Sequence, residues 1–371
     1  MAKGRADRRS ETHFFQANNH MSDQQRAVAT IAHLVHRYFI WIVLASYIVA
    51  AIAPRAGALL HEKHLIDIGS THLTASAATV LLALLLFNAG LFTSVQEARS
   101  VAQRPFLVVS GVLGNFAIPY AFVVIASLCL KPWHNPDEAQ QILAGLAFIA
   151  AMPIAGSSTA WTQSANGNIS LSIGLVLATT LVSPLFTPLV IDGVGALTTG
   201  DYSQDLHELA AGSAANFLGA WVVAPSLLGV LVARFIPRTR LAAAKPYLKL
   251  ANYATILVLI YANSALSLPA VVSDPDGDFL ALMLAVVVAL CVIAFAVGYL
   301  CARLGGAGRG ETASLMFGLG MTNNGAALTL ASTAMANHAG VLMPVILYTL
   351  VQHFAAAAVD RMLFQTAGDP A

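Results

Sequence analysis

The chain has 371 residues, of which 57% are hydrophobic and only 10% are charged, with a formal net charge of +1 at pH 7. Apolar runs of roughly 20 residues recur along most of it, and this is the length that crosses the hydrocarbon core of a bilayer. The composition indicates an integral membrane protein and excludes a large soluble domain. The scattered basic residues give no indication of nucleic-acid binding.

The expected elements begin after a polar segment. Residues 1–35 lack the apolar region of a secretory signal, so we expect a cytoplasmic N-terminal tail without fixed structure. Apolar runs bounded by charges or by Pro and Gly clusters then predict ten membrane-spanning helices. Their expected ranges are 38–54, 75–94, 104–130, 139–165, 168–191, 213–236, 246–269, 277–302, 311–335 and 340–364. Residues 193–212 are expected to form an acidic extracytoplasmic loop, and residues 365–371 a C-terminal tail.

The basic residues are distributed unevenly between the two sides of these ten spans. On the side that holds both termini lie 16 of the 19 Lys and Arg residues, whereas Arg55, Lys63 and Lys131 lie on the other side. Short loops rich in Lys and Arg stay in the cytoplasm. Both termini are therefore predicted to be cytoplasmic, and the acidic loop to lie outside.

Ten spans divide at the acidic loop into two sets of five, residues 36–192 and 213–364. Because five is an odd number, the second set must cross the membrane in the opposite sense, which is the topology of inverted repeats. The fourth span of each set is interrupted by small and polar residues, at 153–159 and at 318–325. A helix can break at membrane depth only where protein or a water-filled cavity satisfies its backbone. Matched interruptions therefore predict the binding site of a transporter.

Each break also creates helix ends, whose N–H groups attract anions and whose C=O groups attract cations. Hydroxyl and amide side chains surround both breaks, and such hard ligands suit a carboxylate or a monovalent cation better than a soft metal. These side chains are Ser157, Ser158, Thr159, Thr162, Gln163 and Ser164 near the first break, and Thr322, Asn323, Asn324 and Thr329 near the second. Small polar residues also permit close helix packing in membranes, but two clusters at matched positions favour a binding site.

Several short motifs together resemble the bile acid:sodium symporter family, and the chain is similar to a divergent bacterial-type member of it. The motifs lie at residues 88–91, 114–119, 156–159, 167–172 and 320–325. The resemblance covers about residues 35–365. It implies an all-α membrane protein of a bacterial inner membrane, with ten helices in two inverted repeats, a panel and a core domain, and broken, crossing helices four and nine. It also implies transport of an organic anion, such as a bile acid, pantoate or another carboxylate, with sodium.

The resemblance further implies two sodium sites. The first would use Ser158, Thr159 and Ser172, and the second Asn115, Thr322 and the backbone carbonyls of Leu319 and Met321. Both sites share an acidic ligand in the family, and Gly318 stands at its position here. Because no acidic residue is expected near the middle of the membrane, no charged protein side chain offsets the charge of a buried cation. Sodium coupling is therefore in doubt.

The residues expected to contact the anion are Gly156, Ser157, Asn323, Asn324 and His353. His353 is the titratable side chain expected well inside a span, and histidine titrates in the physiological range. Weak sodium coupling linked to the substrate, proton coupling through His353 and uncoupled transport all stay open. A non-transporting membrane sensor of the same fold is the alternative from another class. We expect no catalytic residue and no cofactor apart from a sodium ion. The expected partners are a small organic anion and the lipid bilayer, and no nucleic acid; the oligomeric state stays open.

Overall fold

Helices make up most of the computed structural model. The structure describes residues 27–28, 30–32, 34–35, 38–62, 64–68, 71–93, 104–273, 275–335 and 337–365. Most of the predicted N-terminal tail lies outside the described residues, as does the C-terminal tail apart from residue 365. The described residues between 27 and 35 are helical, so helix begins before the predicted end of the tail.

Within the described ranges, ten elements lie between Phe39 and Glu208. They are α3 (Phe39–Ile52), α4 (Arg55–Leu59), β1 (His64–Ile68), β2 (Thr71–Ala75), α5 (Ala77–Leu91), α7 (Pro105–Cys129), α8 (Pro136–Ala151), α9 (Ser157–Ser164), α10 (Ile169–Gly195) and α11 (Gly200–Glu208). The second half follows with η2 (Leu209–Ser213), α12 (Ala214–Phe217), η3 (Leu218–Val223), α13 (Ala224–Ala233), α14 (Arg238–Ser264), α15 (Leu268–Ser273), α16 (Gly277–Leu304), α17 (Arg309–Gly320), α18 (Asn324–Ala334), η4 (Ala339–Val341), α19 (Leu342–Val359) and η5 (Asp360–Gln365).

Among the described residues, five helical stretches are long and apolar enough to cross a membrane on their own. They are Pro105–Cys129, Ile169–Gly195, Gly200–Ala233, Gly277–Leu304 and Ala339–Phe364. The other five expected spans also contain helix, but none of them is a single long apolar helix in the described part of the chain. α3 and α5 are short, α14 begins with charged residues, and the fourth and ninth expected spans are each divided in two. The relation of the two halves as inverted repeats stays a prediction.

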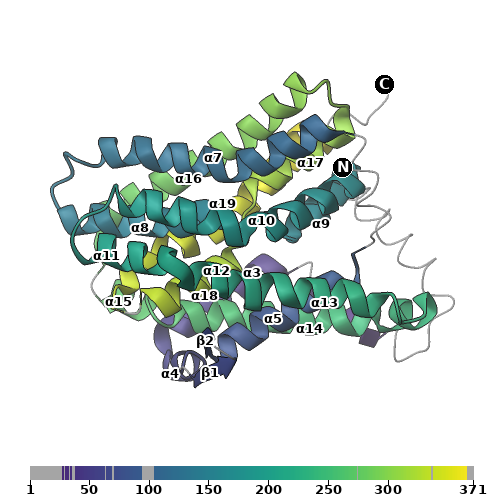
Figure 1. Cartoon of the computed structure of the whole chain (residues 1–371), viewed down its shortest axis with the longest axis horizontal. Coiled ribbons are helices and arrows are strands. Elements are labelled where there is room, and N and C mark those ends of the chain that lie inside the picture. The colour runs from purple at the N-terminus through teal and green to yellow at the C-terminus, as the bar shows by residue number, and fades with distance from the viewer. Residues whose placement is uncertain are drawn as a thin grey trace.

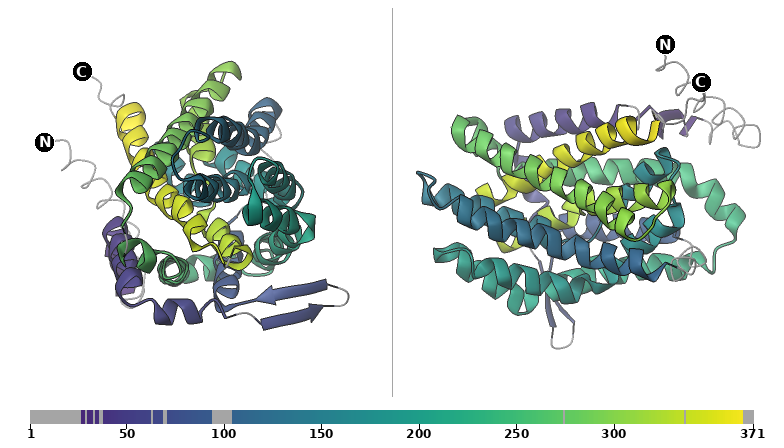
Figure 2. Two further views of the ribbon diagram at one scale, coloured as in Figure 1. Left: turned by 90° about the vertical axis from the view of Figure 1, so that its left-hand side faces the viewer. Right: turned by 90° about the horizontal axis from the view of Figure 1, so that it is seen from above.

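Three details differ from the predicted elements. The described elements are all helical, as predicted, apart from one hairpin: between α4 and α5, β1 and β2 pair in an antiparallel arrangement that projects from the helices (Figure 2). The expected loop 193–212 contains α11, because Tyr202 and Leu206 lie four residues apart and bury one face of it. α14 begins at residue 238 instead of 246, because its first turns contain charged helix formers that an apolar pattern omits.

The helices pack into two groups. α5 packs against α13, and α14 packs against α3 and α5; we call these four helices the panel. The remaining long helices, α7, α8, α10, α16, α17 and α19, pack against one another and form the core bundle. In Figure 1 the panel lies below the core bundle, and α18 lies between them.

Two glycines bring panel helices α5 and α13 into close contact. A Cβ atom added at Gly90 would collide with the carbonyl oxygen of Ser226, and one added at Gly229 would collide with that of Phe87. Backbones can approach this closely only where side chains are missing, as in many membrane helix pairs. The panel is therefore held together by backbone contact at this point.

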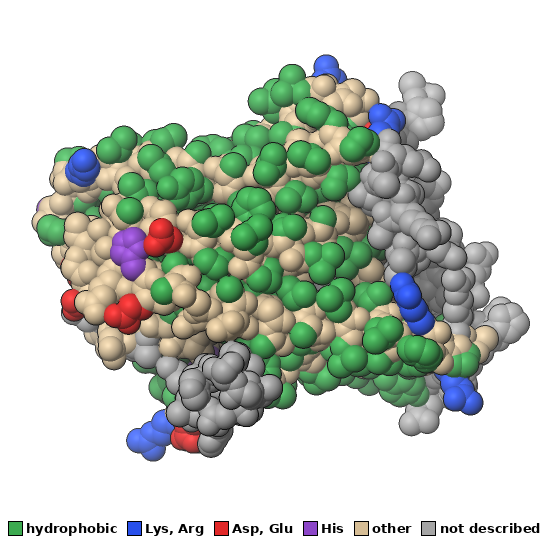
Figure 3. All heavy atoms as spheres, viewed as in Figure 1, with side chains coloured by type: hydrophobic (Ala, Val, Ile, Leu, Met, Phe, Trp, Pro, Cys, Tyr) green, Lys and Arg blue, Asp and Glu red, His purple; other side chains and the backbone are tan. Residues whose placement is uncertain are grey.

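Side-chain chemistry follows the long axis of the molecule. On the face drawn in Figure 3, hydrophobic side chains cover the middle, whereas charged side chains and a histidine lie towards the two ends. We call the end that carries α11 the α11 end (Figure 1). An apolar band with charges at both ends is the surface expected of a protein that spans a bilayer.

Candidate site at the crossing of two broken helices

The two broken spans meet at their interruptions. α8 ends at Ala151, and its cap residue Met152 is extended, with φ −89° and ψ 150°. Pro153 follows, and proline cannot donate the hydrogen bond that would continue a helix. α17 ends at Gly320, and its cap residue Met321 is likewise extended, with φ −130° and ψ 112°. After each break the chain becomes helical again within a few residues, as α9 and as α18.

The extended residues of the two breaks satisfy each other's backbone groups. Ile154 and Thr322 form an isolated antiparallel bridge. The N–H of Ala155 donates to the carbonyl oxygen of Met321 at 2.9 Å. The N–H of Asn323 donates to the carbonyl oxygen of Pro153, also at 2.9 Å. Each break thus supplies backbone partners for the other, which is the condition for non-helical backbone at membrane depth.

Polar side chains from neighbouring helices complete this backbone pairing. The N–H of Ile154 donates to Thr179 Oγ1 at 3.2 Å, and the N–H of Thr322 donates to Gln352 Oε1 at 3.1 Å. Thr187 donates its hydroxyl to the carbonyl oxygen of Ala151. Sequence reasoning did not assign these three side chains to the site. The available signal was a buried polar residue inside an otherwise apolar span, which must find a partner.

The residues predicted for the first sodium site lie partly together. Thr159 Oγ1 and Ser172 Oγ are 3.1 Å apart and share a hydrogen bond. The Ser158 hydroxyl is completely buried, and among the described residues it has no hydrogen-bond partner. A buried hydroxyl without a protein partner is expected to bind water, an ion or a ligand. These oxygens are hard, neutral donors of the kind that sodium accepts.

The surroundings of Gly318 are apolar. A Cβ atom added there would lie 3.5 Å from Ile154 Cδ1 and 3.6 Å from Leu175 Cδ1, which is ordinary contact. Ile154 and Leu175 belong to a buried cluster with Leu107, Leu171 and Leu315, against which Val176 packs. Where the family resemblance implies a shared carboxylate, the chain therefore has aliphatic carbon.

The residues predicted for the second sodium site are mostly engaged with protein. Thr322 Oγ1 donates to Asn324 Oδ1 at 2.9 Å, and the Met321 carbonyl accepts from Ala155. The side chain of Leu319 lies against α7 at Gly114. Asn115 donates to the carbonyl oxygen of Met152 at 3.0 Å, but its own Oδ1 is buried without a partner among the described residues. One amide oxygen thus stays available beside the crossing.

The predicted anion-binding residues differ in exposure. Gly156 and Ser157 are exposed, Asn323 and His353 are half-buried, and Asn324 is buried. Asn323 Oδ1 accepts from the N–H of Ala326 at 3.2 Å and so caps α18. The Asn324 amide nitrogen and His353 Nδ1 are both buried, with no partner in the part of the chain that the structure describes. His353 follows Gln352, whose oxygen contacts the crossing.

The helix ends give the crossing two electrostatic sides. α9 and α18 begin beside the crossing, so their first N–H groups present partial positive charge to it. α8 and α17 end there and present partial negative charge from their last carbonyls. The crossing can therefore attract an anion on one side and a cation on the other.

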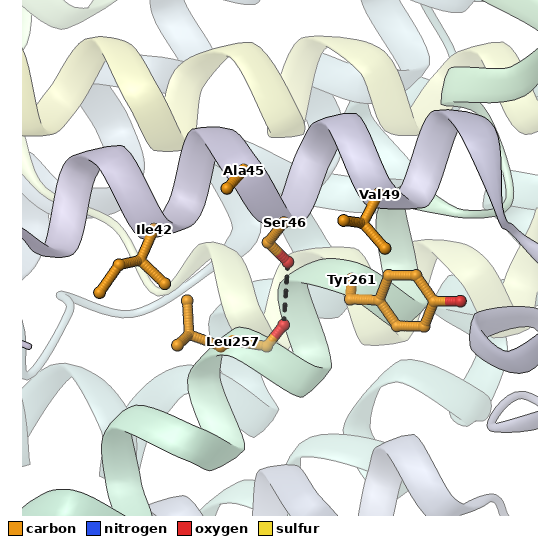
Figure 4. A pocket seen from close by; sticks show the side chains of 6 residues that line it. All are labelled: Ile42, Ala45, Ser46, Val49, Leu257 and Tyr261. Atoms are coloured by element: carbon orange, nitrogen blue, oxygen red, sulfur yellow. Dashed lines mark hydrogen bonds between the residues drawn. The ribbon is translucent and has the colours of Figure 1, made fainter.

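A separate groove lies on the surface between α3 and α14 (Figure 4). Its lining residues are Ile42, Ala45, Ser46, Val49, Leu257 and Tyr261. Ser46 donates its hydroxyl to the carbonyl oxygen of Leu257 at 3.3 Å, which leaves an almost wholly apolar lining. This groove has none of the predicted site residues, so we do not assign the ligand site to it.

Comparison with known proteins gives one family and two relatives from Bacillus subtilis. The model of the Sodium Bile acid symporter family matches residues 79–274. The uncharacterized sodium-dependent transporter YocS is 26% identical over 261 residues, covering 70% of this chain and 74% of the relative. The uncharacterized protein YbaS is 28% identical over 225 residues, covering 60% of this chain and 68% of the relative. The matched segment includes the first broken helix and ends before the second.

Proposed function

Because the chain belongs to the sodium bile acid symporter family, we propose that it carries a small organic anion across the membrane by alternating access. Membership of this family makes it a multi-pass membrane transporter. Support for an anionic substrate comes from the crossing, where α9 and α18 begin. Helix N-termini bind carboxylates through free N–H groups. The exposed Ser157 and the half-buried Asn323 lie at these two N-termini and add side-chain donors.

The proposed substrate is a bile-acid-like or pantoate-like carboxylate. Gly156, Ser157, Asn323, Asn324 and His353 would contact it. The unpartnered Asn324 amide nitrogen is a donor suited to a carboxylate oxygen. The proposed location is a bacterial inner membrane, with both termini in the cytoplasm and the α11 end outside.

For sodium, we propose weak coupling that depends on bound anion. The family name and the printed name of YocS both support sodium. One observation argues against a tight sodium site: Gly318 has no side chain, and its position faces Ile154 and Leu175. The free oxygens of Ser158 and Asn115, with Thr159 and Ser172, are neutral. A cation held by neutral oxygens alone lacks charge compensation, and the carboxylate of the substrate would supply it.

Proton coupling through His353 is the second candidate. The observation that favours it is the buried Nδ1 atom, which has no partner among the described residues. Such a nitrogen can take up a proton when an anion binds close to it. Uncoupled transport and a non-transporting sensor would use the same anion site.

A thermal-shift screen tests the proposal. The purified protein is heated with small carboxylates, each with sodium or potassium chloride and at two pH values, because a bound ligand raises the unfolding temperature. We expect at least one carboxylate to stabilise the protein, and sodium to increase that effect. If no carboxylate stabilises it under any condition, the proposed anion site is wrong. Binding without accumulation of the labelled anion in proteoliposomes would identify a sensor instead of a carrier.

A further inference from the structure

A second group of buried polar side chains lies away from the crossing, where α14 ends. Asn263 and Ser264 are its last residues, and Ser267 follows in the next turn. All three are at most 1% exposed. Both amide atoms of Asn263 and the hydroxyls of Ser264 and Ser267 have no hydrogen-bond partner within the described residues. Unpaired polar atoms of this kind destabilise a closed structure, so their presence requires an explanation. We call these three residues the polar seam.

The polar seam occupies one side of α14. The opposite side carries Ala262 and Ala265, on which α4 rests: a Cβ atom added at Gly57 would lie 2.6 Å from Ala265 Cβ. At about 100° of rotation per residue, Asn263 and Ser264 point away from α4, and Ser267 follows in the turn after the helix. α3 lies along the side of α14 that carries Leu257 and Tyr261. α14 also packs against α5, α18 and α19, so the seam faces the side where the panel meets α18 and α19.

Two further contacts join α18 and the residues after it to their neighbours near the α11 end. Ser332, near the end of α18, lies 3.3 Å from Nδ1 of His61, which follows α4. The residues after α18 reach the α11 end itself, because His338 Nε2 lies 3.6 Å from Asp205 Oδ2 on α11. The seam therefore lies between the crossing and the α11 end, where panel and core bundle are in contact.

A permanent contact inside the panel looks different. α5 and α13 meet through Gly90 and Gly229, where backbone packs on backbone. A contact that never opens has no use for unpaired hydroxyl and amide groups, whereas a contact that opens to water satisfies them in the open state.

We infer that the polar seam is a gate, in which Asn263, Ser264 and Ser267 bind water and pass the carboxylate of the substrate when α14 and α18 separate at the α11 end. This inference rests on the proposed alternating access. The seam offers amide and hydroxyl donors to a carboxylate but no positive charge, so an anion would be hydrated there without being trapped.

Cysteine labelling tests the gate without any substrate. In a chain whose three cysteines, Cys129, Cys291 and Cys301, are replaced by Ala, Ser264→Cys or Ser267→Cys is exposed to a membrane-impermeant maleimide from each side of the membrane. Glu208→Cys on the exposed part of α11 reports which side the reagent reaches. Ser183→Cys is the matched control, because Ser183 is 0% exposed inside the core bundle and bonds within its own helix.

We expect the seam cysteines to react about tenfold faster than Ser183→Cys, and only from the side that labels Glu208→Cys, because a minor open state exposes them. The proposed gate would be overturned if the seam cysteines and Ser183→Cys react at the same rate, whether both are slow or both are fast. Neither result affects the carboxylate screen, so failure of the gate and failure of the proposed function are separate outcomes.

A second variant distinguishes a gate from a structural role. Asn263→Leu replaces unpaired polar atoms by an apolar group of similar size. If the seam is a gate, this change raises the unfolding temperature and slows the labelling of Ser267→Cys, because the closed state is favoured. A lower unfolding temperature with unchanged labelling would mean that Asn263 supports the fold, and the gate would be rejected.

Discussion

The backbone of Ile154 pairs with the backbone of Thr322, although the two residues lie in different halves of the chain. This bridge ties the first broken helix to the second at the point where each stops being helical. Because each break supplies partners for the other, neither interruption could persist alone inside a membrane. A change in the groups that hold the bridge should therefore affect the stability of both breaks.

Gln352→Leu should test the support of the bridge. Gln352 is 3% exposed, and its Oε1 accepts from the N–H of Thr322. Its loss leaves a buried donor unpaired, which costs about 1–3 kcal/mol. We expect a lower unfolding temperature in detergent and weaker stabilisation by any carboxylate ligand.

Thr349→Val is the matched control for Gln352→Leu. Within the described part of the chain, the Thr349 hydroxyl bonds only to the carbonyl of Val345 in the same helix, at 2.8 Å. Its removal should change stability by less than about 0.5 kcal/mol. Equal effects of the two variants would show that the Gln352 contact does not support the crossing.

Much of this site follows from the sequence, but its supporting contacts do not. Pro153 and the run from Gly318 to Asn324 mark both breaks, because Pro and Gly interrupt an apolar helix wherever it lies. Thr179 and Gln352 hold the breaks through contacts between helices, and hydrophobic periodicity carries no information on which helices become neighbours.

The hairpin was not predicted for a different reason. Residues 64–68 and 71–75 flank Gly69 and Ser70, and a short Gly-containing connection between β-compatible segments is a hairpin signal. These two segments are too short to be predicted as membrane spans. The apolar filling around Gly318 could not be predicted either, since Ile154 and Leu175 come from two other helices.

Gly229→Val should separate α5 from α13. The new Cβ would collide with the carbonyl oxygen of Phe87, and an overpacked contact of this kind costs about 1–3 kcal/mol or more. We expect a clear fall in the unfolding temperature. Gly219→Ala provides the comparison, because nothing lies within 4 Å of a Cβ atom added there. If both variants unfold at the same temperature, the panel does not depend on the glycine contact.

His353→Gln should distinguish proton coupling from the other modes. Glutamine retains hydrogen-bonding atoms but does not titrate, whereas histidine changes charge between about pH 5 and pH 8. For a proton-coupled carrier, we expect uptake into proteoliposomes to vary with pH in the parent chain and to become flat in the variant. His338→Gln serves as the control, because His338 pairs with Asp205 at the α11 end. A pH profile that survives in His353→Gln would remove this residue from the coupling step.

Gly318→Asp should test why sodium coupling is weak. The added Cβ fits at 3.5 Å from Ile154 Cδ1 and 3.6 Å from Leu175 Cδ1, so the main change is a buried negative charge. Such a charge is costly unless a cation pairs with it. We expect the variant to unfold at a lower temperature than the parent chain in potassium chloride and to recover part of the loss in sodium chloride. Gly318→Asn, which has nearly the same shape without the charge, should respond equally to the two salts. If sodium stabilises the parent chain as strongly as the Asp variant, the neutral oxygens already hold the ion, and the missing carboxylate does not weaken sodium binding.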